Sequence, residues 1–113
     1  MSRDDASLLD MLQAARRIVE AARLMTQEQF LADWKAQSVL QHQLLVLGEA
    51  VKRLSPQFRE RHPEIPWRAI AGQRDVLAHH YDAVDLPEVW LVVTEKVPPL
   101  LAFLESVAPK EGA

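Results

Sequence analysis

The stretch Leu40-Gln-His-Gln-Leu-Leu-Val-Leu-Gly-Glu-Ala-Val-Lys-Arg-Leu54 sets the expected fold of this 113-residue chain. Its apolar side chains recur in steps of three and four residues, at Leu40, Leu44, Leu47, Val51 and Leu54. That spacing lines them up along one side of an α-helix. The stretch therefore predicts an amphipathic helix whose apolar stripe packs against partner helices.

Three further segments carry apolar residues in the same rhythm. They contain Leu8, Leu12, Ala15, Val19 and Ala22; then Trp67, Ile70, Leu77 and Tyr81, with Arg74 interrupting the stripe; then Leu86, Trp90, Val93, Val97, Leu100 and Leu104. Four such segments, joined by short polar connections, predict an all-α fold, an antiparallel up-and-down four-helix bundle. The length of the chain suits a single domain over residues 1–113, with a loose tail at 108–113.

Capping residues predict one or two short extra helices between the long ones. Thr26 with Gln29 resembles a capping box that opens a short helix around 27–33. Ser55 followed by Pro56 suits a cap and a first helical position, which predicts a short turn running to His62.

Prolines and one aspartate mark the later boundaries. Pro66 can open the third helix, and Asp85 can cap the fourth with Pro87 in its first turn. Pro98 and Pro99 fall inside the fourth helix and are expected to kink it.

The composition excludes several classes of protein. There are no cysteines, which removes disulfides and thiolate chemistry and fits a cytoplasmic location. No segment offers the roughly 18 apolar residues that a membrane span needs. Without cysteines, without an HxxxH or HExxH pattern and without a glycine-rich phosphate loop, we expect neither a metal site nor a bound cofactor.

The charges are unevenly distributed along the chain. The formal net charge is −3, yet residues 52–74 carry six basic and two acidic side chains, a local excess of +4. The six cations are Lys52, Arg53, Arg59, Arg61, Arg68 and Arg74. This run is either a solvated face or a rim that attracts phosphate.

Arg74 is a permanent cation at an apolar position of the third stripe. Since arginine is rarely buried without a partner, it must pair with a carboxylate, face a polar cleft or lie at a subunit interface. Glu49 on the second helix is the candidate partner. If that ion pair is purely structural, Arg74 needs no catalytic role.

The stretch Arg74-Asp-Val-Leu-Ala-His-His-Tyr81 places three chemically active side chains on one helix. At roughly 100° per residue, Tyr81 lies about 20° from Arg74 but His79 lies about 140° from it. Arg74 and His79 can therefore meet only if the helix frays or if a two-fold axis brings two subunits together. Asp75, four residues before His79, can hydrogen-bond the imidazole and fix its tautomer. His80 is expected to lie apart, beside Val76.

The pattern of an arginine, four residues, a histidine, any residue and a tyrosine resembles the signature of the HEPN superfamily. The most similar branch is the HepT-like toxins of the MNT/HepT toxin-antitoxin systems. Gly48-Glu49-Ala50 and Pro98-Pro99-Leu100 extend the resemblance, which covers roughly residues 8 to 105. It implies a HEPN-like bundle and a homodimer that assembles its active site from both protomers.

The resemblance also implies roles for individual residues. Arg74 and His79 would be catalytic, with Glu49 and Asp75 supporting them, and no metal would take part. Tyr81 would accept AMP from a nucleotidyltransferase antitoxin. Asp75 stands where the family commonly has asparagine, so its charge would stabilise an imidazolium and repel phosphate.

Three functions follow as hypotheses. The first is an RNA-cleaving toxin of a type VII-like system, dimeric and neutralised by the nucleotidyltransferase. The second is a non-catalytic helical module that binds a nucleotidyltransferase and presents its substrate. The third, a plain dimerising bundle, gives no use to Arg74, His79 and Tyr81.

Overall fold

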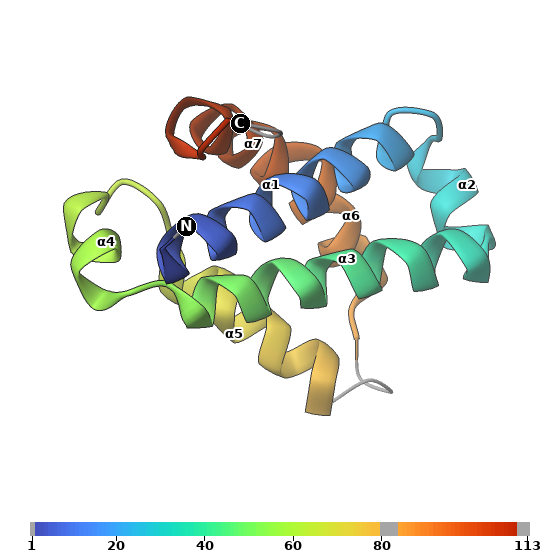
Figure 1. Ribbon diagram of the computed structural model, residues 1–113. Coiled ribbons are helices and arrows are strands. Elements are labelled where there is room, and N and C mark those ends of the chain that lie inside the picture. Colours follow the sequence, from blue (N-terminus) through green and yellow to red (C-terminus); the bar gives the residue numbers. More distant parts are fainter. Residues whose placement is uncertain (1, 80–83, 111–113) are drawn as a thin grey trace.

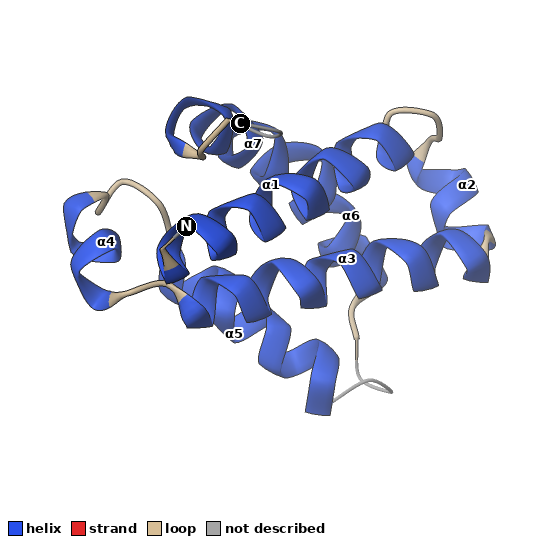
Figure 2. Cartoon of the chain, viewed as in Figure 1, coloured by secondary structure: helices blue, strands red, loops and turns tan. Residues whose placement is uncertain are grey.

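The structure, a computed structural model, describes residues 2–79 and 84–110, and its regular elements there are all helical (Figures 1 and 2). Three long helices, a composite fourth helix and two short helices follow one another. The elements are α1 (Arg3–Ala22), α2 (Gln27–Ala32), α3 (Trp34–Arg53), α4 (Pro56–Arg61), α5 (Trp67–His79), α6 (Leu86–Leu91), the π-helical turn η2 (Val92–Lys96) and α7 (Val97–Val107). This arrangement confirms the all-α bundle with two short extra helices.

Helix α3 is central to the packing. It lies alongside α1 for most of its length, and α5 crosses its other side (Figure 1). Helix α7 and the π turn pack on α1, which closes the bundle. None of the helices within the described residues is both long and apolar enough to cross a membrane.

The core follows the predicted stripes in part, since Ile70, Leu86 and Trp90 are only half-buried and Val89, outside the predicted stripe, is buried. All five stripe residues of α3 are buried. In α1 the predicted Val19 is only half-buried, whereas Ile18 and Met11 are fully buried. The buried side of α1 is therefore turned toward Met11 and Ile18, since α3 and α7 pack on it from two directions.

The predicted caps are confirmed. Thr26 and Gln29 form a reciprocal capping box at α2, Ser55 caps α4 ahead of Pro56, and Asp85 caps α6 by accepting a hydrogen bond from the Glu88 N–H. Helix α5 begins at Trp67, and the carbonyl of Pro66 accepts a bond from the Ile70 N–H at 3.1 Å, so Pro66 directly precedes the helix.

The fourth helix departs from the expected proline kink. The α-helical pattern is interrupted one turn before the prolines, by the π turn Val92–Lys96. Pro98 and Pro99 fall in the first turn of α7, directly after the π turn, whose Val92 carbonyl accepts a hydrogen bond from the Val97 N–H. The interruption of the α-helical pattern therefore precedes both prolines.

A polar contact fastens the N-terminus to the middle of the chain. The Asp4 carboxylate accepts bonds from the Ser55 N–H at 2.8 Å and the Ser55 hydroxyl at 2.7 Å, although these residues are 51 positions apart. The two bonds hold the pKa of Asp4 below its ordinary value of 3.8. The first turn of α1 is thereby attached to the α3–α4 junction.

Candidate active site

Helix α5 presents three faces, and the first is pressed closely against α3. A Cβ atom added to Gly48 would collide with the Cβ of Arg74 and lie 3.1 Å from the carbonyl oxygen of Ile70. Because glycine has no side chain, the two backbones can approach at this point. Gly48 therefore sets the distance at which Arg74 passes over α3.

Arg74 is held there by carboxylates from both helices. Its Nε lies 2.9 Å from Glu49 Oε2, which confirms the predicted partner. Both atoms are buried, but the N–H is not directed at the oxygen, so the contact is an ion pair without hydrogen-bond geometry. Arg74 Nη1 also donates to Asp75 Oδ1 at 3.3 Å.

Asp75 does not support His79 as expected. Its Oδ1 accepts instead from Lys52 Nζ on α3 at 2.5 Å and from Arg74. The hydrogen bond from Lys52 is the main reason why the pKa of Asp75 lies below 3.8. Lys52 therefore donates to the Asp75 carboxylate, where the sequence spacing had predicted His79 as the donor.

We call Glu49, Lys52, Arg74 and Asp75 the charge cluster. Its formal charges sum to zero, two positive and two negative. The expected repulsion between Asp75 and a phosphate is therefore offset locally by Lys52. The sequence placed Lys52 in the basic run but not beside Asp75, although its position three residues after Glu49 on the same helix was a usable signal.

His79 lies on a different face of α5. It is the last residue of the helix and is exposed to solvent, whereas Arg74 is half-buried against α3. The helix continues regularly through His79, so fraying before it does not bring the two side chains together. Tyr81 and His80 lie outside the described residues.

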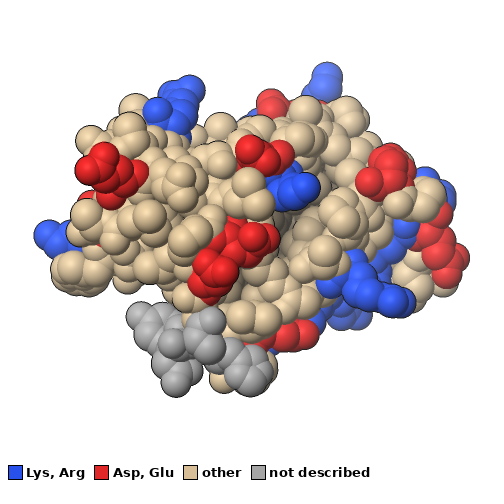
Figure 3. Space-filling view, turned by 180° about the vertical axis from the view of Figure 1, so that it is seen from behind, with Lys and Arg blue, Asp and Glu red and all other residues tan. Residues whose placement is uncertain are grey.

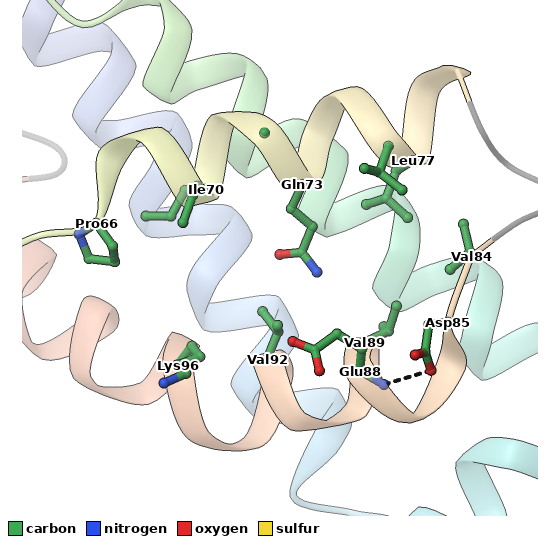
Figure 4. A pocket seen from close by; sticks show the side chains of 13 residues that line it. Pro66, Ile70, Gln73, Leu77, Val84, Asp85, Glu88, Val89, Val92 and Lys96 are labelled. Atoms are coloured by element: carbon green, nitrogen blue, oxygen red, sulfur yellow. Dashed lines mark hydrogen bonds between the residues drawn. The ribbon is translucent and has the colours of Figure 1, made fainter.

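The third face of α5 borders a cavity of about 520 Å³ shared with α6 and the π turn (Figure 4). Ile70, Gln73 and Leu77 point into it from α5, opposite Val89 and Val92. This cavity could not be predicted from the sequence, because it depends on how α5 and α6 are placed in space. Among residues 2–79 and 84–110, no three His, Asp or Glu side chains come close enough to share a metal ion.

The basic run at 52–74 has two kinds of member. Lys52, Arg53 and Arg74 form ion pairs with Asp75, Asp10 and Glu49. The Arg61 guanidinium lies over the Phe58 ring. The side chains of Arg59 and Arg68 have no ion-pair partner among the residues described.

Comparison with known proteins identifies the class. The chain belongs to the HepT-like ribonuclease family, since a family model described as "Ribonuclease HepT-like" matches residues 11–107. This range contains the whole charge cluster and His79.

Two relatives illustrate the similarity. The chain is 39% identical over 100 residues to a "Probable ribonuclease HepT" of Thermococcus cleftensis, covering 88% of this chain and 91% of the relative. It is 36% identical over 102 residues to a "Putative RNase" of Methanocaldococcus jannaschii, covering 90% and 84% respectively. No solved structure matches the chain at a significant level.

Proposed function

We propose that this protein is a metal-independent endoribonuclease that acts as a homodimer and is the toxin of a type VII-like MNT/HepT system. The antitoxin is a nucleotidyltransferase that transfers AMP to Tyr81. The observation that carries the proposal is the arrangement of α5, where an exposed His79 and a carboxylate-held Arg74 occupy neighbouring faces of one helix in a chain of the HepT-like family.

The 2′-OH of RNA is the nucleophile in this reaction. The enzyme must therefore transfer protons, and it need not activate a water molecule. In the proposed step, His79 accepts the proton of the 2′-OH as this oxygen attacks the phosphorus. The new O2′–P bond forms while the P–O5′ bond breaks, which gives a 2′,3′-cyclic phosphate, and the leaving 5′-oxygen takes the proton that His79 accepted. His79 is exposed at the end of α5, so its imidazole can reach a bound RNA strand and carry out both proton transfers.

Arg74 has the complementary role. Negative charge grows on the non-bridging phosphate oxygens during the attack, and a planar guanidinium can donate two parallel hydrogen bonds to them. Glu49 and Asp75 hold the guanidinium in place beforehand, which reduces the cost of ordering it during the reaction.

A dimer supplies the geometry that one chain lacks. Arg74 faces α3 and His79 faces solvent, so a complete site forms if a two-fold axis near the end of α5 brings His79 of the partner subunit to Arg74. Val76 lies three residues before His79 on α5 and is 44% exposed, which favours apolar contact between two copies of this helix.

Tyr81 follows directly after this end of α5 in the sequence. An AMP group on its hydroxyl would bring a bulky anion next to the site, and the added charge would repel the RNA backbone. Modification by the antitoxin would thus inactivate the enzyme without unfolding it. The alternative function, a non-catalytic module that presents a substrate to a nucleotidyltransferase, uses the same surface but no proton transfer.

The test is cleavage of RNA by the purified, unmodified protein and by its His79→Ala variant. We expect His79→Ala to lose cleavage by about 10²-fold or more, since proton transfer by a positioned side chain contributes that much. Its thermal stability should stay close to that of the wild type, because His79 is exposed.

His80→Ala is the internal control and should retain cleavage. If a folded His79→Ala protein cleaves RNA like the wild type, the proton carrier is another residue. A wild-type protein that never cleaves RNA, yet binds the nucleotidyltransferase, would favour the non-catalytic alternative.

A further inference from the structure

The groove between α4 and α5 is lined by two arginines and leads to the charge cluster. It is an open depression of about 960 Å³ that includes Arg59, Arg68, Gly72 and Asp75. We infer that this groove binds the phosphodiester backbone of single-stranded RNA and guides it along α5 toward Arg74. The inference rests on the proposed function, which leaves the path of the substrate open.

Two arginines of the groove, Arg59 and Arg68, have no ion-pair partner among the residues that the structure describes. Neither Arg59 nor Arg68 has a carboxylate within ion-pair distance in the described part of the chain, although acidic residues outnumber basic ones overall. Glu60 also lines the groove, and Asp75 is already neutralised by Lys52. Two guanidinium groups without an ion-pair partner, both in one groove, can bind the phosphates of an RNA strand.

Arg59 provides a second, independent argument. Its Nε is buried and has no hydrogen-bond partner within the described residues. A buried donor on a permanent cation is costly unless something accepts from it. A phosphate oxygen would satisfy this donor once the Arg59 side chain turns its Nε toward the groove, since a guanidinium donates readily to phosphate.

The floor of the groove is open at Gly72. A Cβ atom there would have nothing within 4 Å, in contrast to Gly48 on the opposite helix. Arg68, Gly72 and Asp75 follow one another at helical spacing, and His79 comes one turn later. A strand that enters at Arg68 therefore has a clear course along α5 to His79.

The surface view agrees with this course. Seen from behind, basic side chains gather toward the end of the molecule where α4 and the start of α5 lie, with acidic side chains among them (Figure 3). At the inner end of the groove, Asp75 connects it directly to Arg74 through the 3.3 Å hydrogen bond. The groove and Arg74 would thus lie on one helix, to which the partner subunit would add its histidine.

The experiment measures binding of a fluorescent, single-stranded 2′-O-methyl RNA oligonucleotide, which lacks the attacking hydroxyl and cannot be cut by the proposed step. The double variant Arg59→Gln/Arg68→Gln should bind it on the order of tenfold more weakly. The slope of log affinity against log salt should become shallower by about 1.4, since about 0.7 is expected for each phosphate contact to a single strand.

The matched control is Arg17→Gln/Arg23→Gln, which removes the same charge from exposed positions on and after α1. It should leave the affinity and the salt slope near wild type. Gly72→Glu, which places a negative charge on the open floor, should weaken binding at least as much as the double variant while folding normally.

Unchanged binding and an unchanged salt slope in the double variant would overturn the inference. A changed oligomeric state with unchanged RNA binding would overturn it as well, and would assign the groove to contact between copies. The two proposals fail separately: weaker binding in the variants of a wild-type protein that cuts no RNA supports the groove while removing the proposed catalysis.

Discussion

The two sides of α3 differ in what holds them to their neighbours. The core side presents Leu40, Leu44, Leu47 and Val51, all buried, and its contacts are apolar. The side that meets α5 presents Gly48, Glu49 and Lys52, and its contacts are charged. One helix therefore packs the core on one side and, on the other, holds Arg74 and Asp75 of α5 through Glu49 and Lys52.

This difference separates stability from chemistry. Apolar contacts on the core side contribute free energy of unfolding in proportion to the area that they bury. The half-exposed ion pairs on the other side contribute little to stability, because solvent screens them. Substitutions on the core side of α3 should therefore lower stability and spare cleavage. Substitutions in the charged contacts with α5 should lower cleavage and spare stability.

Leu40→Ala should give the largest effect. Leu40 is 1% exposed, and truncating a buried leucine costs about 2–5 kcal/mol in unfolding free energy. Urea denaturation measures this loss, and cleavage per folded molecule should remain near wild type. Val39→Ala is the matched control, because Val39 is 52% exposed and should cost about 0.5 kcal/mol or less.

Arg74→Lys should give the opposite pattern. A lysine can pair with one carboxylate but cannot grip a phosphate with two parallel bonds, so cleavage should fall on the order of 10²-fold. The thermal midpoint should hardly change, with about 1 kcal/mol lost at most. Both are measured on one sample, with Arg17→Lys as control. Wild-type cleavage would remove the catalytic role and leave Arg74 a structural partner of Glu49.

Gly48→Ala and Gly72→Ala should change stability in opposite directions. Alanine is favoured over glycine inside a helix by about 1 kcal/mol. At Gly72 the new methyl group meets nothing within 4 Å, so the variant should gain up to that amount. At Gly48 the methyl group collides with Arg74, and overpacking should outweigh the gain by about 1–2 kcal/mol. If urea denaturation gives the same change in unfolding free energy for both variants, α3 and α5 do not approach closely at Gly48.

Asp4→Asn should give the smallest effect, and one that depends on pH. The pKa of Asp4 is lowered in the folded protein, so its contribution is present above its ordinary value of 3.8 and is lost as the pH falls through the folded value. At pH 7 the variant should lose about 1 kcal/mol, the usual worth of such hydrogen bonds. The difference from wild type should shrink below about pH 4. A difference that is the same at low pH would rule out the charged contact with Ser55.

The features predicted from the sequence are those that depend on residues close together in the chain. Periodicity placed the buried stripe of α3, and local side chains such as Thr26 and Asp85 marked helix starts. The Glu49–Arg74 pair was found because few acids were available on the second helix. The domain boundaries, the dimer and the role of Tyr81 stay predictions.

The features that were missed depend on tertiary placement. Asp75 was assigned to His79 because the two are one helical turn apart, but Lys52 on the crossing helix competes for the same oxygen. The Asp4–Ser55 contact joins residues 51 positions apart, and no local rule suggests it. Proline chemistry predicted a kink but not that a π turn would accommodate it one turn earlier.

The π turn has a consequence for how this family can change in length. A π turn accommodates one more residue than an α-helical turn between the same neighbours. Deleting one residue within Val92–Lys96 would therefore restore an α-helical turn and keep Leu100 and Leu104 directed at the core. A one-residue deletion in the α-helical middle of α1 or α3 would instead rotate everything after it by about 100° about the helix axis. Relatives with a helix one residue shorter should therefore carry the difference at the π turn.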